Sequence, residues 1–237
     1  MSGLFTGRYR FADKVVEVNS LYEDVHRYCA VYRTDAPADL IVTITEKDIE
    51  YERSRSEIKT WHDPYLEELA VYRKICEKMP AYGTILFHGS VIAVDGQAYL
   101  FAASSGTGKS THASLWRKLL GDRAIMVNDD KPLLHVGDVT VAYGTPYDGK
   151  HKLSTDIAVP LKAICILERS TDNHIEKITK KEAYPMLMQQ TYRPNDVSAL
   201  QMTLPLIDRL ADSVGLYRLG CNMDISAAEL SYEFMSR

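Results

Sequence analysis

The sequence has few cysteines, and their arrangement fits neither a zinc site nor a disulfide framework. Its 237 residues contain four cysteines, which are scattered and include no C-x2-C pair. Such spacing argues against metal binding through thiolates, and we expect reduced thiols in a cytoplasmic protein. The first eleven residues carry charges and lack an apolar stretch, so no secretory signal is expected there.

Long hydrophobic runs and a strong charge of one sign are also lacking. The apolar runs are far shorter than the roughly 20 residues that cross a bilayer, so we expect no membrane partner. The formal net charge of −4 is not that of a nucleic-acid-binding protein. No internal repeat or low-complexity tract is present. With an apolar fraction of 46%, the chain can build one large domain or two small ones.

The hydrophobic pattern predicts a mixed α/β fold that begins with short strands. The strands expected in the first sixty residues cover Gly7–Phe11, Lys14–Val18, Arg27–Arg33 and Leu40–Thr45. A polar segment follows, and then Asp63-Pro64 predicts a helix with Asp63 as its N-cap. We expect a β-rich N-terminal subdomain over residues 1–60 and a catalytic domain over residues 61–237, unless the chain forms one continuous domain.

The remaining residues predict a mixed sheet followed by a helical C-terminal third. The expected strands cover Thr84–His88, Val91–Val94, Gln97–Ala102, Ala124–Val127, Val139–Tyr143 and Lys162–Glu168. Asp95-Gly96 predicts a hairpin turn between the second and third of these strands. Later helices are expected over Lys181–Gln190 and Asp196–Ser213, with a kink or break at Pro205. Ser226 and Glu229 predict a capping box at the start of a last helix.

The most informative segment is a glycine-rich turn between an apolar strand and a helix. Residues 103–110 read ASSGTGKS, which has the A/G-x4-G-K-S/T spacing of a phosphate-binding loop. Its glycines allow backbone N–H groups to face phosphates, Lys109 supplies a cation, and the Ser110 hydroxyl is a magnesium ligand. A mobile Ser/Gly linker is the alternative, but a linker would not lie between two apolar elements. We therefore expect ATP and Mg²⁺ as cofactors. The expected nucleotide contacts are Ser104, Ser105, Gly106, Thr107, Gly108, Lys109, Ser110 and Thr111.

Two adjacent carboxylates follow the next apolar strand. Asp129 and Asp130 come about twenty positions after Ser110, in the manner of a Walker B segment. One carboxylate can join the magnesium shell, and the other can accept a hydroxyl proton. A solvated Asp-Asp turn is the alternative interpretation. His88 also ends a predicted strand, although a lone histidine is more often structural than catalytic.

A turn-rich loop over residues 144–152 offers further charged groups. Asp148, Lys150, His151 and Lys152 lie in this loop, whose cations could meet the γ-phosphate or an acidic acceptor. A charged surface turn explains the same residues equally well. Arg193 is a weaker candidate of the same kind.

Three of these motifs together resemble the catalytic domain of the HPr kinase/phosphorylase family. They are Phe87-His88-Gly89-Ser90, the loop at 103–110 and Asn128-Asp129-Asp130. Residues 105–109 resemble, more distantly, the phosphate loop of ATP-dependent phosphoenolpyruvate carboxykinase. The resemblance covers about residues 86–130 and implies a fold in which the phosphate loop follows a hairpin strand.

The resemblance also implies roles for individual residues. His88 matches the active-site histidine, Lys109 the phosphate-binding lysine, and Ser110 a magnesium ligand. Asp130 matches the aspartate that takes the acceptor's proton, and Asp129 then supports the metal or His88. Hexamers in that family make a homo-oligomer plausible. The family's Glu-Arg-Gly segment and its late arginine motif have no counterpart in this sequence.

The function that we expect is ATP-dependent phosphorylation of a hydroxyl group, and serine is the acceptor residue that we favour. The acceptor could belong to a protein, a peptide or a small molecule. A carboxykinase-like phosphotransferase is an alternative, although no arginine pair to grip a dicarboxylate is evident. A nucleotide-sensing module without turnover is the other alternative, and the paired aspartates argue against it because binding alone requires no base.

Overall fold

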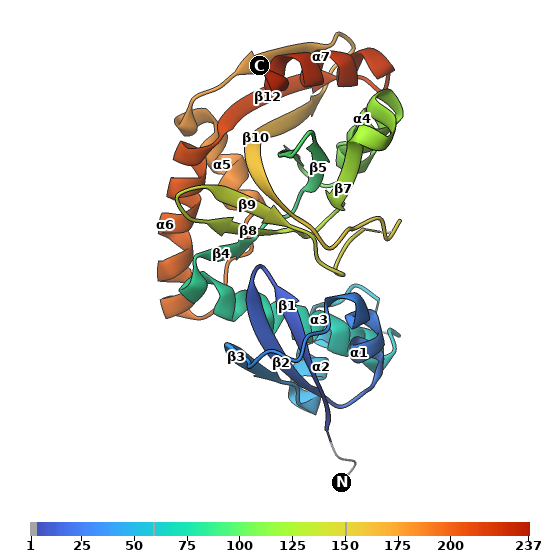
Figure 1. The fold of residues 1–237 in the computed structure, drawn as a ribbon, viewed down its shortest axis with the longest axis vertical. Helices are drawn as coiled ribbons and strands as arrows, with labels where there is room; N and C mark the ends of the chain where they lie inside the picture. Colours follow the sequence, from blue (N-terminus) through green and yellow to red (C-terminus); the bar gives the residue numbers. More distant parts are fainter. Residues whose placement is uncertain (1–3, 59, 150) are drawn as a thin grey trace. The chain divides into compact units, whose positions relative to one another are not determined.

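The computed structural model describes residues 4–58, 60–149 and 151–237. The chain divides into two compact units, Met1–Met79 and Pro80–Arg237 (Figure 1). This division falls after helix α3 (Asp63–Lys78), whereas the predicted boundary precedes that helix. The reason is that α3 packs on α1, α2 and β3, which all belong to the first unit.

The first unit combines a three-stranded sheet with short helices. Its elements are β1 (Phe5–Phe11), β2 (Lys14–Ser20), α1 (Asp24–Tyr28), β3 (Leu40–Thr43), α2 (Glu46–Arg55) and α3. The sheet order is β1-β2-β3, with β1 antiparallel and β3 parallel to β2. The strand predicted over Arg27–Arg33 is wrong, because this segment forms the end of α1 and a 3-10 turn that bury Cys29 and Tyr32. The N-cap of α3 is His62, one residue before the predicted Asp63.

The second unit is built on a nine-stranded mixed sheet. Its strands are β4 (Thr84–Leu86), β5 (Ser90–Val94), β6 (Gln97–Ala102), β7 (Ala124–Asn128), β8 (Leu133–Val136), β9 (Thr140–Tyr143), β10 (Ala158–Arg169), β11 (His174–Lys177) and β12 (Gly215–Cys221). The main order is β4-β8-β9-β10-β6-β5-β7, and β12 pairs with both β10 and β11. The long strand β10 pairs with β9 at its beginning and with β6 and β12 further along.

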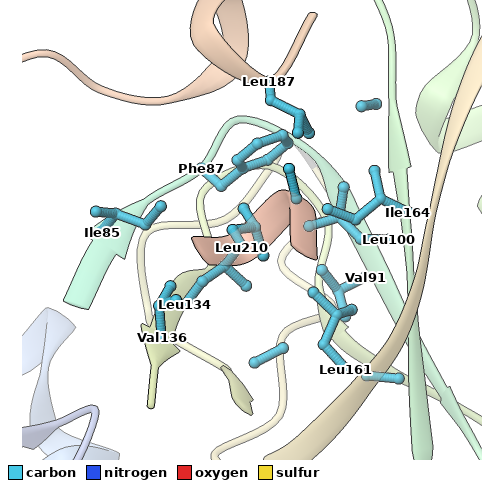
Figure 2. Packing of buried hydrophobic residues seen from close by; sticks show 14 of the residues in the cluster. Ile85, Phe87, Val91, Leu100, Leu134, Val136, Leu161, Ile164, Leu187 and Leu210 are labelled. Atoms are coloured by element: carbon cyan, nitrogen blue, oxygen red, sulfur yellow. The ribbon is translucent and has the colours of Figure 1, made fainter. Parts of the chain in front are cut away.

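Helices cover both faces of this sheet, and the strands are accordingly apolar on both faces. The helices are α4 (Lys109–Leu120), α5 (Lys180–Gln190), α6 (Val197–Ser213) and α7 (Ile225–Ser236). Leu100 of β6 belongs to the core beneath α5 and α6, whereas its neighbour Phe101 packs beneath α4 and α7. Figure 2 shows Phe87 next to Leu187 of α5 in the first of these cores. The predicted mixed α/β class is therefore confirmed.

Several predictions for the C-terminal third are wrong in detail. Helices α5, α6 and α7 make up most of the chain after β10, as predicted, but the unpredicted strands β11 and β12 lie between them and extend the sheet. Pro205 does not divide α6, which runs as one helix from an N-cap at Asp196. The last helix begins at Ile225 after an N-cap at Asp224, so the predicted capping box at Ser226 does not form. Among the described residues, none of the helices has the length and apolarity needed to span a membrane.

The strand directions bring five separate segments to one edge of the sheet. β6, β10 and β12 run parallel, and β7 shares their direction because both β6 and β7 are antiparallel to β5. The carboxyl ends of these four strands and the start of β5 therefore meet. Ligands of α/β proteins bind at such an edge. The segments are residues 88–90, 103–108, 128–130, 169–170 and 221–223.

Candidate functional site

The phosphate loop joins β6 to α4 in a conformation that needs its glycines. Gly106 has φ 75° and Gly108, the N-cap of α4, has φ 123°, values that side chains other than glycine rarely adopt. The Lys109 ammonium donates to the Ala103 carbonyl at 3.1 Å. Burial lowers the pKa of Lys109, and the carboxylates of Asp130 and Asp129 oppose that shift. A half-buried cation is thus held at the start of a helix, where the helix dipole also favours anions.

The turn that carries both aspartates is fixed by the buried Asn128. Its side-chain oxygen accepts hydrogen bonds from the backbone N–H groups of Asp130 at 2.9 Å and Lys131 at 2.7 Å. Its amide nitrogen donates to the Thr145 hydroxyl at 3.0 Å. The two carboxylates that follow Asn128 therefore have fixed backbone positions.

Asp129 is buried among hydroxyl groups. Its side chain accepts a hydrogen bond from the Ser90 hydroxyl at 3.1 Å, and Ser110 also hydrogen-bonds to it. Burial raises the pKa of Asp129, and these two bonds and the nearby His151 offset part of the shift. A carboxylate beside a serine hydroxyl is an oxygen donor set of the kind that suits Mg²⁺.

The rest of a magnesium shell would come from the ligand. In the parts of the chain that the structure describes, no group of three or more His, Cys, Asp and Glu side chains is arranged to hold a metal. Magnesium sites commonly use one or two carboxylates together with substrate phosphates. The pair of Ser110 and Asp129 fits that pattern.

Asp130 differs from its neighbour because it pairs with a histidine. His88 Nε2 lies 2.9 Å from Asp130 Oδ1, and Lys131 Nζ lies 3.8 Å from Oδ2. Burial raises the pKa of Asp130, but the hydrogen bond from His88 and the charges of Lys131 and Lys109 outweigh it, so the net pKa is lowered. The backbone N–H of His88 donates to the backbone carbonyl of Gln190 at 2.8 Å, which fixes the position of His88. Asp130 is therefore an ionised carboxylate near Lys109.

A pocket of about 270 Å³ opens beside Ser110 and Asp129. We call it the metal-side pocket. Ser110, Ser114 and Arg117 line it from one face of α4, and His151 lines it from the loop after β9. The i, i+4, i+7 spacing of the three helical residues explains this shared face. The remaining lining residues are Met126, Asp129 and Leu153.

The charged residues predicted to contact the acceptor or the phosphates have different surroundings in the structure. His151 lines the metal-side pocket, whereas Asp148 accepts a hydrogen bond from the Ser154 N–H at 3.0 Å and so holds its own loop. Lys152 is exposed, with φ 48°. Arg193 is exposed in the segment after α5. Lys150 lies outside the described residues.

Sequence reasoning missed several residues that build this site. Arg117 could have been found from its helical spacing to Ser110. Ser90 was considered only as part of the motif at residues 87–90. Thr145 has no local sequence signal, because its contact with Asn128 forms only when the chain after β9 lies beside the end of β7.

Comparison with known proteins places the chain in a family. Residues 57–205 match the profile of the family described as SynChlorMet cassette protein ScmC. The chain belongs to this family. The ScmC match spans the phosphate loop, the Asp129–Asp130 pair and the loop that carries His151.

The chain was also compared with curated proteins and with solved structures. No curated protein matches the chain. Among solved structures, the HPr(Ser) kinase/phosphatase from Coxiella burnetii aligns with 64% of this chain and 99% of its own, at 8% identity and a TM-score of 0.33.

Proposed function

We propose that this ScmC-family chain transfers the γ-phosphoryl group of ATP to a hydroxyl group, and we favour that of a serine. The observation that carries the proposal is the Asp130–His88 pair at 2.9 Å beside the phosphate-loop Lys109. Phosphoryl transfer requires a phosphate cradle, a metal site and a group that deprotonates the acceptor. Nucleotide binding alone would not require the last of these.

Asp130 would accept the proton of the attacking hydroxyl. Its lowered pKa keeps the Asp130 carboxylate ionised at neutral pH. The contact from His88 Nε2 to Oδ1 fixes the position of this carboxylate. Lys109 would neutralise charge on the β- and γ-phosphates. A positioned base typically contributes roughly 10²–10⁴-fold to the rate.

Ser110 and Asp129 would hold Mg²⁺, which would neutralise phosphate charge and orient the γ-phosphoryl group. The oxygen-only chemistry of this pair, together with its contact through a hydrogen bond, supports the assignment. Because Asp129 is the more buried of the two carboxylates, it is better suited to a metal than to a mobile acceptor.

The metal-side pocket would lie beside the γ-phosphate end of the loop. Arg117 brings positive charge to this pocket, which also contains Ser110 and Asp129. A cation there suits the developing charge of the transferring group. The acceptor can be part of a protein, a peptide or a small molecule, since all three present a hydroxyl group.

The proposal is tested by transfer of label from γ-³²P ATP. Wild-type chain, Mg²⁺ and labelled ATP would be incubated with an extract of the source cells, which is then separated into protein, peptide and small-molecule fractions. We expect label in one fraction. Tight ATP binding without transfer to any fraction would favour a nucleotide-sensing module. Phosphoenolpyruvate formed from oxaloacetate and ATP would favour a carboxykinase-like reaction.

A further inference from the structure

A second and larger pocket lies on the other side of the phosphate loop. Its volume is about 480 Å³. Gly106, Thr107 and Gly108 form one wall, and another is formed by Leu167, Arg169, Ser170 and residues 221–223. These segments lie at or just after the carboxyl ends of β6, β10 and β12, three parallel strands. The pocket is thus the crevice in which α/β proteins hold ligands.

The two pockets lie on two faces of the same helix. Ser110, Ser114 and Arg117 face the metal-side pocket, whereas Thr111 and Leu115 face the larger one. The phosphate loop runs between them. A triphosphate on this loop therefore has a direction, because Lys109 and the Ser110–Asp129 pair mark the γ-phosphate end. The opposite end of such a ligand would then lie toward the larger pocket.

We propose that the larger pocket binds the nucleoside of the triphosphate, and we name it the nucleoside pocket. The inference rests on the proposed function, since it needs a nucleoside triphosphate on the loop. Leu115, Leu167 and Met223 supply apolar surface, and Met223 is 78% exposed. The Arg169 guanidinium donates to the Gly106 carbonyl and lies at the pocket wall. Thioether and guanidinium groups both pack well on aromatic rings.

A buried histidine beside the nucleoside pocket has a ring nitrogen without a hydrogen-bond partner among the described residues. The Ser231 hydroxyl donates to the Ala228 carbonyl at 3.1 Å, so it accepts from Trp116 Nε1 at 2.8 Å and from His112 Nε2 at 3.0 Å. Nδ1 of the same ring has no hydrogen-bond partner among the described residues. His112 is only 2% exposed and lines the pocket. A polar group of a ligand that reaches Nδ1 would satisfy that atom.

The nucleoside pocket offers few polar groups for reading a base. The Asn222 amide donates to the Thr171 carbonyl at 3.1 Å and accepts from the Asp224 N–H at 3.0 Å. Ser170 accepts from the Asp172 N–H at 3.3 Å. These side chains are therefore already engaged within the chain, whereas His112 Nδ1 is a buried group of the pocket that a ligand could still satisfy.

The test compares ATP with inorganic tripolyphosphate, which lacks a nucleoside. Calorimetry with Mg²⁺ would measure both affinities for wild type, Met223→Ala and Ser170→Phe. The first variant removes apolar contact and the second fills the pocket with a ring. Met202→Ala on the exposed side of α6 is the matched control, since Met202 is 39% exposed and does not line the pocket. Loss of the Met223 side chain should weaken ATP about tenfold.

We expect both pocket variants to weaken ATP while tripolyphosphate affinity stays within about twofold, and the control to leave both unchanged. The nucleoside pocket would be overturned if Met223→Ala and Ser170→Phe left the ATP affinity unchanged. If the wild-type chain still bound ATP and tripolyphosphate in competition with each other, the proposed function would stay intact. If the wild-type chain binds neither compound, the proposed function fails as well.

Discussion

The adjacent aspartates of the site have opposite electrostatic surroundings. Burial raises the pKa of Asp129, whereas the His88 bond and nearby lysines lower that of Asp130 against burial. The adjacent pair could be noticed in the sequence, but the opposite pKa directions of its two members could not. That difference depends on contacts with Ser90 and His88, which lie about forty positions earlier in the chain.

Replacing His88 with alanine should change the pH dependence of transfer. Without the hydrogen bond and charge of His88, burial is opposed only by lysines, and the pKa of Asp130 rises. Asp130 would then be protonated at a higher pH, so the acid limb of kcat/KM should move to higher pH. A pH–rate profile measures this shift, with the exposed His62→Ala as control. An acid limb that does not move would show that Asp130 is not the titrating base.

Asp129→Asn should stabilise the fold while impairing transfer. Because burial raises its pKa in the folded chain, ionised Asp129 costs stability above that pKa, and the cost disappears as the pH falls through it. Asparagine keeps an oxygen for the Ser90 hydroxyl without the charge. Thermal unfolding should therefore show a higher Tm at pH 7, a smaller gain at low pH, and weaker Mg²⁺-dependent transfer. An Asp129→Asn chain that is less stable at pH 7 would contradict the account.

At the scale of elements, the approach of two loops depends on Gly144. A Cβ on Gly144 would lie 1.8 Å from the Thr155 carbonyl oxygen and 2.8 Å from that of Val127. Val127 precedes the Asn128 turn, so a side chain at position 144 would displace the segment that carries both aspartates. The chain after β9 can approach β7 and Thr155 this closely because position 144 has no side chain.

Gly144→Ala should therefore destabilise the chain by about 3 kcal/mol, at the upper end of overpacking costs. Gly96→Ala is the matched control: it has φ 78° and nothing within 4 Å of a Cβ, so it should cost about 1 kcal/mol. Urea unfolding of both variants measures the difference. Equal costs would mean that the loop relaxes freely around Gly144.

Elements with strong local signals could be predicted from the sequence. Asp95-Gly96 predicted the β5–β6 hairpin, in which both residues have positive φ. The segment at Arg27–Arg33 is apolar and was predicted as a strand, but tertiary packing makes it helical. β12 was missed because its strand character comes from pairing with β10 and β11, which lie far away in the sequence. Long-range pairing of that kind leaves little local pattern.

At the scale of the whole molecule, the described candidate site lies within residues 80–237, one of the two compact units. The phosphate loop and the Asp129–Asp130 pair could be found from sequence because their chemistry is local. The metal-side pocket and nucleoside pocket could not, since each collects residues from three or more separate segments.

Nucleotide binding should stabilise the folded chain. Ligand at a hundred times its Kd adds about 2.7 kcal/mol, which corresponds to a rise in Tm of roughly 5–10 °C for a chain of this size. Differential scanning calorimetry with and without Mg·ATP measures the rise. Lys109→Ala should abolish most of it, and Lys118→Ala, later on the same helix, should not. A full rise in Lys109→Ala would remove the phosphate loop from the account.

The most direct test of the central claim is transfer of γ-³²P from ATP by wild type and Asp130→Asn, each with the acceptor fraction that wild type labels. We predict that Asp130→Asn binds Mg·ATP with wild-type affinity and transfers label roughly 10²–10⁴-fold more slowly. Equal transfer rates for the two chains would contradict the assignment of Asp130 as the base.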